Sequence, residues 1–123
     1  MESKQAVNAL AALAQETRLA IFRLLVQVGP SGLSVGEISA DVKTSPATLS
    51  FHLKEMVHAD LIEPRQDGRF IFYSANYAQM NGLLGFLTEN CCAKDGVSCL
   101  PMTKGKCVPT PATKIKRRTA NKP

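Results

Sequence analysis

The chain has 123 residues, of which 45% are hydrophobic and 20% are charged, and its formal net charge at pH 7 is +5. This length is typical of one domain with a tail. No apolar run approaches the ~18 residues of a membrane helix, and no signal-peptide pattern opens the chain, so we expect a soluble, cytoplasmic protein with no membrane partner.

The positive charge lies at the C-terminal end. Residues 109–123 contain five of the fifteen basic residues and none of the ten acidic ones, so residues 1–108 carry equal numbers of each. The basic pI of ≈ 9.2 therefore belongs to the tail. Its run Lys114–Arg118 is interpreted as a solvated tail or as a DNA arm, and DNA binding has to be argued from local placement elsewhere.

Two helices are predicted before the break at Gly29-Pro30. They cover residues 2–14 and 17–28. The apolar positions on one face of the first are Ala6, Val7, Leu10 and Leu13. Those expected inside on the second are Leu19, Phe22, Leu25 and Val28.

The central stretch predicts a helix-turn-helix. Ser34 and Glu37 form a capping box for a helix over residues 34–42. Ser45 is a good N-cap for a helix over residues 45–59, with Pro46 at its first position. The apolar stripe of this second helix consists of Leu49, Leu53, Met56 and Val57. Two short helices joined by a brief turn are typical of DNA-binding domains.

The opposite face of that second helix carries the residues expected to contact DNA. Its first turn is small and hydroxyl-bearing, so it can approach a duplex closely. Phe51 lies ~200° from Leu49 and is expected to face DNA. His52 borders the buried stripe and is interpreted as packed or bonded to a phosphate. The expected DNA contacts of this helix are Ser45, Ala47, Thr48, Ser50, Phe51, His52 and Lys54.

A β-hairpin follows. The β-prone runs 61–66 and 69–74 flank Asp67-Gly68, which predicts a two-residue type I′ turn. On the second strand, Ile71 and Tyr73 are expected to face the core. Arg65 and Arg69 lie beside the turn and are predicted to contact DNA, with solvated charges as the alternative.

Residues 76–90 predict the last helix, with Asn76 as N-cap and Gln79 as its capping-box partner. Gly82 and Gly85 lower helix propensity and permit close approach of another helix. The apolar face is interpreted as core packing or as a dimer seam. The candidate dimer residues are Tyr77, Met80, Leu83, Leu84 and Leu87.

The order α-α-α-α-β-β-α predicts a mainly α, winged helix-turn-helix fold. We expect residues 1–92 to form a DNA-binding and dimerisation domain. Residues 93–123 are expected to form a flexible, basic, Cys-containing tail.

From Leu13 to Leu87 the chain resembles the ArsR/SmtB family of metal- and metalloid-responsive repressors. The resemblance rests on residues 17–25, residues 45–53 ending in Ser50-Phe51-His52-Leu53, residues 59–62, and Gly68-Arg69 followed by Tyr73. It implies a homodimer joined through the first and last helices. It also implies that the apo protein binds double-stranded operator DNA and that an inducer releases it.

Two inducer sites of that family are missing from this sequence. Members that sense arsenite on the first helix of the helix-turn-helix carry Cys-Val-Cys, whereas the matching residues 33–37 contain no thiol. Zinc-sensing members place Asp, His and Glu ligands on the last helix, which here offers only Glu89.

The four cysteines are Cys91, Cys92, Cys99 and Cys107. Clustered thiols in a small cytosolic protein indicate metal, metalloid or redox chemistry. Trivalent arsenic is soft and takes three thiolates in a pyramid, and a subset of the family has Cys-Cys after the last helix and a further Cys beyond. We therefore expect Cys91, Cys92 and Cys99 to bind arsenite or antimonite, with Cys107 in reserve or spare.

Other interpretations stay open. The thiols are alternatively a redox switch, a methylarsenite site that needs only two of them, or idle, and the chain is alternatively a metalloid-sequestering protein. Catalysis is not expected, because no histidine neighbours the thiols in sequence and there is no Gly-rich phosphate loop. We therefore expect neither an enzyme nor a catalytic cofactor.

Overall fold

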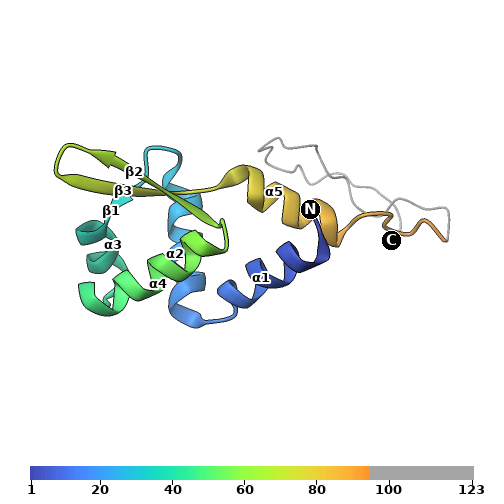
Figure 1. The fold of residues 1–123 in the computed structure, drawn as a ribbon, viewed down its shortest axis with the longest axis horizontal. Coiled ribbons are helices and arrows are strands. Elements are labelled where there is room, and N and C mark those ends of the chain that lie inside the picture. Colours follow the sequence, from blue (N-terminus) through green and yellow to red (C-terminus); the bar gives the residue numbers. More distant parts are fainter. Residues whose placement is uncertain (95–123) are drawn as a thin grey trace.

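The computed structural model describes residues 1–94, which form a winged helix-turn-helix. In chain order its elements are α1 (Ser3–Leu13), α2 (Glu16–Val28), β1 (Leu33–Ser34), α3 (Val35–Val42), α4 (Pro46–His58), β2 (Ile62–Asp67), β3 (Phe70–Ala75) and α5 (Tyr77–Leu87). Figure 1 shows the β2–β3 hairpin extending from one end of the helical body, while α1 packs beside α5 at the other end. The mainly α fold with a hairpin wing is confirmed. None of these helices is long and apolar enough to cross a membrane.

The core lies where α2, α3 and α4 meet the base of the hairpin. Its fully buried large side chains are Ile21, Leu25, Ile38, Leu49, Leu53, Met56, Leu61 and Ile62. Burial of each such aliphatic side chain contributes ~1.5–3 kcal/mol, so these residues fix the position of α4. The predicted buried stripe of α4 is confirmed at Leu49, Leu53 and Met56, while Val57 is only partly buried against the core.

The helix-turn-helix begins each of its helices with the predicted cap. The Ser34 hydroxyl accepts a hydrogen bond from the Glu37 backbone N–H at 3.3 Å, and the Glu37 carboxylate accepts one from the Ser34 N–H at 2.9 Å. At the start of α4, the Ser45 hydroxyl accepts a bond from the Thr48 N–H at 3.4 Å. These bonds pair backbone donors that a helix start leaves unsatisfied.

The last helix is shorter than predicted. It ends at Leu87, and the residues that follow form turns rather than continuing to Asn90. Asn76 is its N-cap, as expected, because its side chain accepts a bond from the Gln79 N–H at 3.0 Å. The predicted capping box is wrong, since the Gln79 amide instead donates to the Ala59 carbonyl at 3.4 Å and ties α5 to the end of α4.

In α1 and α2, the buried residues differ from those predicted on the basis of large apolar side chains. In α1 only the alanines Ala6, Ala9 and Ala12 are buried, while Val7 and Leu10 are exposed. In α2 the prediction placed Leu19 and Val28 inside, and both are exposed; Ile21 is buried instead. Small residues let α1 lie close to its neighbours, so its bulkier side chains point outward.

The wing differs from the prediction in three ways. A two-residue strand, β1, pairs with β3 and makes the sheet three-stranded, in the order β1-β3-β2. The register pairs Asp67 with Phe70, so the two turn residues are Gly68 and Arg69 rather than Asp67 and Gly68. Of these two turn residues, only Gly68 has a positive φ, whereas a type I′ turn needs a positive φ at both, so that turn type is excluded. Ile71 is exposed because the hairpin extends past the core there.

Gly32 should not tolerate a side chain. Its φ is +75°, and a Cβ would fall on the carbonyl oxygen of Tyr73, the residue that pairs with Leu33 in β1. We expect Gly32→Ala to lower the free energy of unfolding by about 2–3 kcal/mol, measured by urea denaturation. Gly36→Ala is the control, because it lies in α3 with open space around it and should be stabilising. An unchanged midpoint for Gly32→Ala would contradict the β1–β3 geometry.

Candidate nucleic-acid interface and thiol site

The N-terminal half of α4 presents a continuous polar face to solvent. Its cap and the residues opposite the buried stripe are all exposed: Ser45, Ala47, Thr48, Ser50, Phe51 and Lys54. Phe51 is 57% exposed, a large value for an aromatic side chain. The face therefore combines hydroxyl groups, one cation and one apolar ring, which are the groups that read bases and hold phosphates in a groove.

His52 differs from the other expected DNA contacts. Its side chain is only 8% exposed, its Nδ1 lies 3.3 Å from an Arg18 guanidinium nitrogen, and its ring meets that of Phe51 edge-on. We therefore remove His52 from the exposed face and keep the alternative of a packed histidine. Sequence reasoning did not identify Arg18 as the partner of His52, because the two residues are 34 positions apart.

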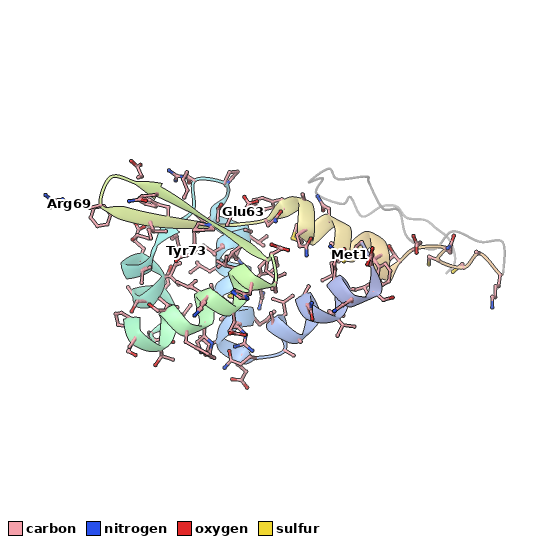
Figure 2. The ribbon with its side chains drawn as sticks, viewed as in Figure 1. Met1, Glu63, Arg69 and Tyr73 are labelled. Atoms are coloured by element: carbon pink, nitrogen blue, oxygen red, sulfur yellow. The ribbon has the colours of Figure 1, made fainter. Side chains whose placement is uncertain are left out.

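The two wing arginines have different surroundings. The Arg65 guanidinium donates to the Ser31 carbonyl at 2.8 Å, lies 3.7 Å from the Asp67 carboxylate and stacks over the Phe72 ring at 5.2 Å. Arg69 belongs to the turn itself, and Figure 2 shows it extending beyond the end of the wing. Arg69 is therefore better placed than Arg65 to reach a phosphate.

The five candidate dimer residues of α5 divide into two groups. The Tyr77 hydroxyl donates to the Val26 carbonyl at 3.0 Å, Met80 packs against the core, and Leu83 is buried. Leu84 and Leu87, in contrast, are 44% and 55% exposed. The first three residues thus take part in packing within one chain, and only the last two are exposed large apolar side chains.

The neighbouring helix α1 adds to that exposed apolar surface. Val7 is 62% and Leu10 is 42% exposed, and α1 packs against α5. Four large apolar side chains are therefore exposed on two contacting helices, and exposed apolar surface of this kind is a candidate for binding a partner.

The thiol pair lies in the turns that follow α5, where Cys91 is the fourth residue after Leu87. Thr88 caps the helix end, because its hydroxyl donates to the Leu84 carbonyl at 2.8 Å, and the Cys91 N–H then bonds the Thr88 carbonyl at 3.0 Å. Asn90 and Cys92 have positive φ, which turns the backbone tightly at both residues. The Cys91 and Cys92 sulfurs lie 3.6 Å apart, much farther than the ~2.05 Å of a disulfide. Both side chains are half-buried.

Residues 1–94 contain no group of three His, Cys, Asp or Glu side chains that could bind a metal ion. The other two predicted ligands, Cys99 and Cys107, lie outside the described residues. The described part of the candidate site is thus two adjacent thiols that can both reach one soft atom.

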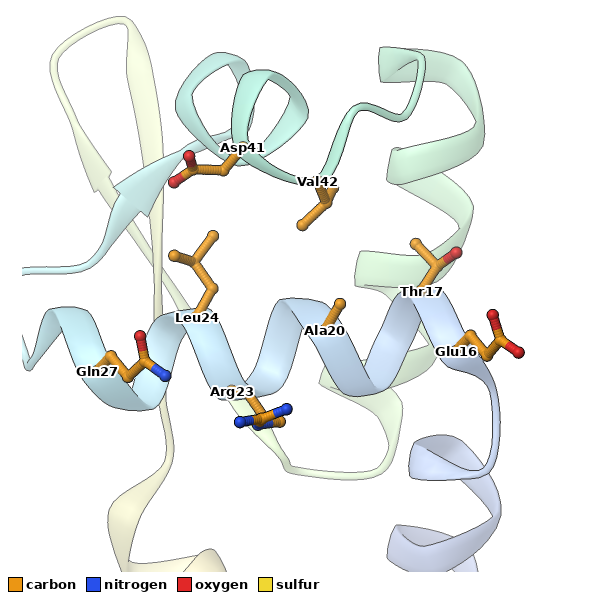
Figure 3. A pocket seen from close by; sticks show the side chains of 8 residues that line it. All are labelled: Glu16, Thr17, Ala20, Arg23, Leu24, Gln27, Asp41 and Val42. Carbon is orange, nitrogen blue, oxygen red and sulfur yellow. The ribbon is translucent and has the colours of Figure 1, made fainter.

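A groove of about 560 Å³ lies between α2 and α3. Figure 3 shows its two carboxylates, Glu16 and Asp41, at opposite ends, with Arg23 on the α2 side. Its polar groups do not converge on a common point, as those of a small-molecule site do. The groove is therefore not a candidate inducer site.

Comparison with known proteins finds a matching domain family and two sequence relatives. A helix-turn-helix domain family matches residues 13–65. The chain is 31% identical over 90 residues to the transcriptional activator HlyU of Vibrio cholerae serotype O1, covering 73% of this chain and 81% of the relative. It is 35% identical over 81 residues to the arsenical resistance operon repressor of Bacillus subtilis strain 168, and the match covers 66% of this chain and 73% of the relative.

Solved structures of similar fold come from proteins described as ArsR-like or as possible ArsR-family regulators. An ArsR-like transcriptional regulator from Rhodococcus sp. RHA1 is similar with a TM-score of 0.65 and 26% identity, covering 76% of this chain and 85% of that one. A homodimeric winged helix-turn-helix DNA-binding domain from Mycobacterium bovis, described as a possible ArsR-family regulator, is similar with a TM-score of 0.57 and 26% identity. The match covers 71% of this chain and 81% of that one. These similar proteins are transcription regulators or DNA-binding domains and not enzymes.

Proposed function

The chain belongs to the ArsR family of winged helix-turn-helix transcriptional regulators, and from this premise we propose that it is a homodimeric repressor released from operator DNA by trivalent arsenic. Arsenite or antimonite is the proposed inducer, bound by Cys91, Cys92 and Cys99. The observation that carries the arsenic proposal is the pair of sulfurs 3.6 Å apart at the end of α5.

The proposed DNA contacts are the exposed residues of α4 and the wing. Ser45, Thr48 and Ser50 carry hydroxyl groups on one face of α4, and Arg69 extends from the wing tip. In a dimer, two copies of α4 would enter successive major grooves at half-sites ~34 Å apart. Arg65 would contribute less directly, because Ser31 and Asp67 already occupy its guanidinium.

Dimerisation is proposed through α1 and α5. Support comes from the exposed apolar side chains of Val7, Leu10, Leu84 and Leu87. The Mycobacterium bovis domain of similar fold is described as homodimeric. The thiol pair would then adjoin the dimer seam, since it begins four residues after the last turn of α5.

The thiol groups of the cysteine pair indicate the class of inducer. Thiolates prefer soft centres, and trivalent arsenic binds three of them in a pyramid, so two adjacent thiols can occupy two corners. Adjacent cysteines suit zinc poorly, because structural zinc sites space the pair by two to four residues. The relative from Bacillus subtilis is an arsenical resistance operon repressor, which supports the same inducer class.

Release requires the ligand to favour a dimer geometry that no longer fits the operator. Binding at the end of α5 would reorder the edge of the seam and change the spacing of the two α4 helices. A coupling free energy of ~1–3 kcal/mol would weaken DNA binding ~5–150-fold.

A second candidate function is favoured by the same pair of sulfurs. Two thiols in contact are sufficient for methylarsenite, which has one position already occupied by its methyl group, or for a redox response to peroxide. Either sensor would use Cys91 and Cys92 and would not need Cys99.

One titration separates these functions. The thiol-reduced protein would be added to its own promoter DNA, and arsenite, antimonite, methylarsenite, cadmium and peroxide would each be tested for release. We expect tight binding by the reduced apo protein and release by arsenite and antimonite. Failure of the reduced protein to bind any fragment of its promoter would contradict the proposed repressor function. The Vibrio relative is described as an activator, so a reporter assay would establish the direction of regulation.

Phe51 tests the proposed reading face. Phe51→Ala should weaken specific operator binding by roughly tenfold, because an apolar contact with a thymine methyl is lost. Its melting temperature should change little, since the ring is 57% exposed. The contrast is Leu49→Ala, which removes a fully buried side chain and should cost ~2–5 kcal/mol of stability. A large fall in melting temperature for Phe51→Ala would place this ring in the core.

A further inference from the structure

Arg18 connects three helices beside the middle of α4. Its backbone N–H donates to the Gln15 side chain at 2.8 Å at the start of α2. Its guanidinium Nε donates to the Ala12 carbonyl of α1 at 2.6 Å, and a terminal nitrogen lies 3.3 Å from His52 Nδ1 in α4. One half-buried side chain thus spans α1, α2 and α4.

This geometry determines where the His52 proton lies. A guanidinium carries only N–H donors, so a hydrogen bond between Arg18 and His52 requires Nδ1 to be the acceptor. A neutral imidazole with Nδ1 unprotonated carries its proton on Nε2. A protonated His52 would instead direct an N–H toward a cation.

The surroundings offer Arg18 no better acceptor in α4. Arg18 lines a cavity of about 410 Å³ between α1 and α4 together with Asn8, Glu55 and His58. Within residues 1–94, neither Glu55 nor His58 forms an ion pair or hydrogen bond with Arg18. The buried His52, directly after Phe51, is the residue of α4 whose side chain lies within hydrogen-bond distance of the Arg18 guanidinium.

We propose that Arg18 is a positioning residue for DNA recognition. It holds His52 in the Nε2–H form and thereby fixes the rotation of α4 relative to the end of α1. This rests on the proposed reading of DNA by α4. Because α1 is also part of the proposed dimer seam, the same link would join the seam to the reading helix.

The first measurement uses the full-length wild-type protein without DNA. Imidazole ¹⁵N chemical shifts, recorded near pH 8 where histidines are mostly neutral, distinguish the two tautomers. The chain has two histidines, and the signal lost in His52→Asn identifies His52. We expect Nε2–H, and Nδ1–H would overturn the proposal whatever the protein binds.

The second measurement is operator affinity in a double-mutant cycle. Arg18→Met and His52→Leu should each weaken binding about tenfold, and the double variant should also lose about tenfold rather than a hundredfold, because both remove one interaction. His52→Asn retains a carbonyl acceptor near Nδ1 and should stay close to wild type. Arg23→Met, an exposed arginine of the same helix, is the matched control and should bind normally.

The outcomes are distinguishable. Additive losses, or an equal loss in Arg23→Met, would overturn the positioning role. If the Arg18→Met variant does not fold, the tautomer of His52 in the wild-type protein becomes the deciding measurement for the proposal. If the wild type binds no operator at all, the proposed function fails, whereas the tautomer still tests the Arg18–His52 link.

Discussion

Leu84→Asp and Leu87→Asp should each produce a monomer that no longer binds operator DNA. Both leucines are exposed on α5 in the single chain and are proposed to be covered in the dimer. An aspartate at that seam would bury an unpaired charge in each protomer, which costs ~3–5 kcal/mol, so dimer affinity should fall more than about a thousandfold. Sedimentation at micromolar concentration measures the oligomeric state, and operator binding is measured on the same sample.

Leu19→Asp is a closely matched control for this prediction. Leu19 is 44% exposed, as is Leu84, but it lies on α2, outside the proposed seam. It should therefore remain dimeric and folded. A dimeric Leu84→Asp protein would contradict the seam on α5, and a monomeric Leu19→Asp protein would extend the seam to α2.

Local rules predicted the parts of the fold that depend on neighbouring residues. The capping box of Ser34 and Glu37 and the cap at Ser45 involve partners three residues away, and both are present. The buried stripe of α4 follows from helical spacing in the same way. Strand β1 was missed because two residues are too short for any periodic pattern, and its pairing with β3 is long-range.

His52 shows the limit of such rules at the candidate site. It lies three residues after Leu49 and four before Met56, so helical spacing alone places it toward the core. A polar side chain there needs a partner, and that partner is Arg18, 34 residues away. Nothing in the sequence pairs these two residues. The same holds for Arg65, whose acceptor, the Ser31 carbonyl, also lies 34 residues away.

Cys91→Ser and Cys92→Ser should each leave operator binding intact and abolish release by arsenite. The two sulfurs lie 3.6 Å apart beyond the end of α5, and Figure 1 shows this part of the chain at the opposite end of the molecule from the start of α4, so we expect DNA binding not to depend on them. A hydroxyl is a poor ligand for soft arsenic, so either change removes one corner of the pyramid. The measurement is the arsenite concentration needed to release half of the bound promoter DNA, which should rise beyond the measurable range.

Cys99 and Cys107 decide the third ligand. Cys99→Ser should also abolish the arsenite response but preserve release by methylarsenite, because the methyl group leaves only two positions for thiols. Cys107→Ser is the matched control, and it should respond normally to both. Full arsenite release in Cys91→Ser would remove the adjacent pair from sensing altogether. Loss of release in Cys107→Ser with Cys99→Ser unaffected would keep the pair and make Cys107 the third ligand, so the segment between Cys92 and Cys107 would have to fold back for the switch to operate.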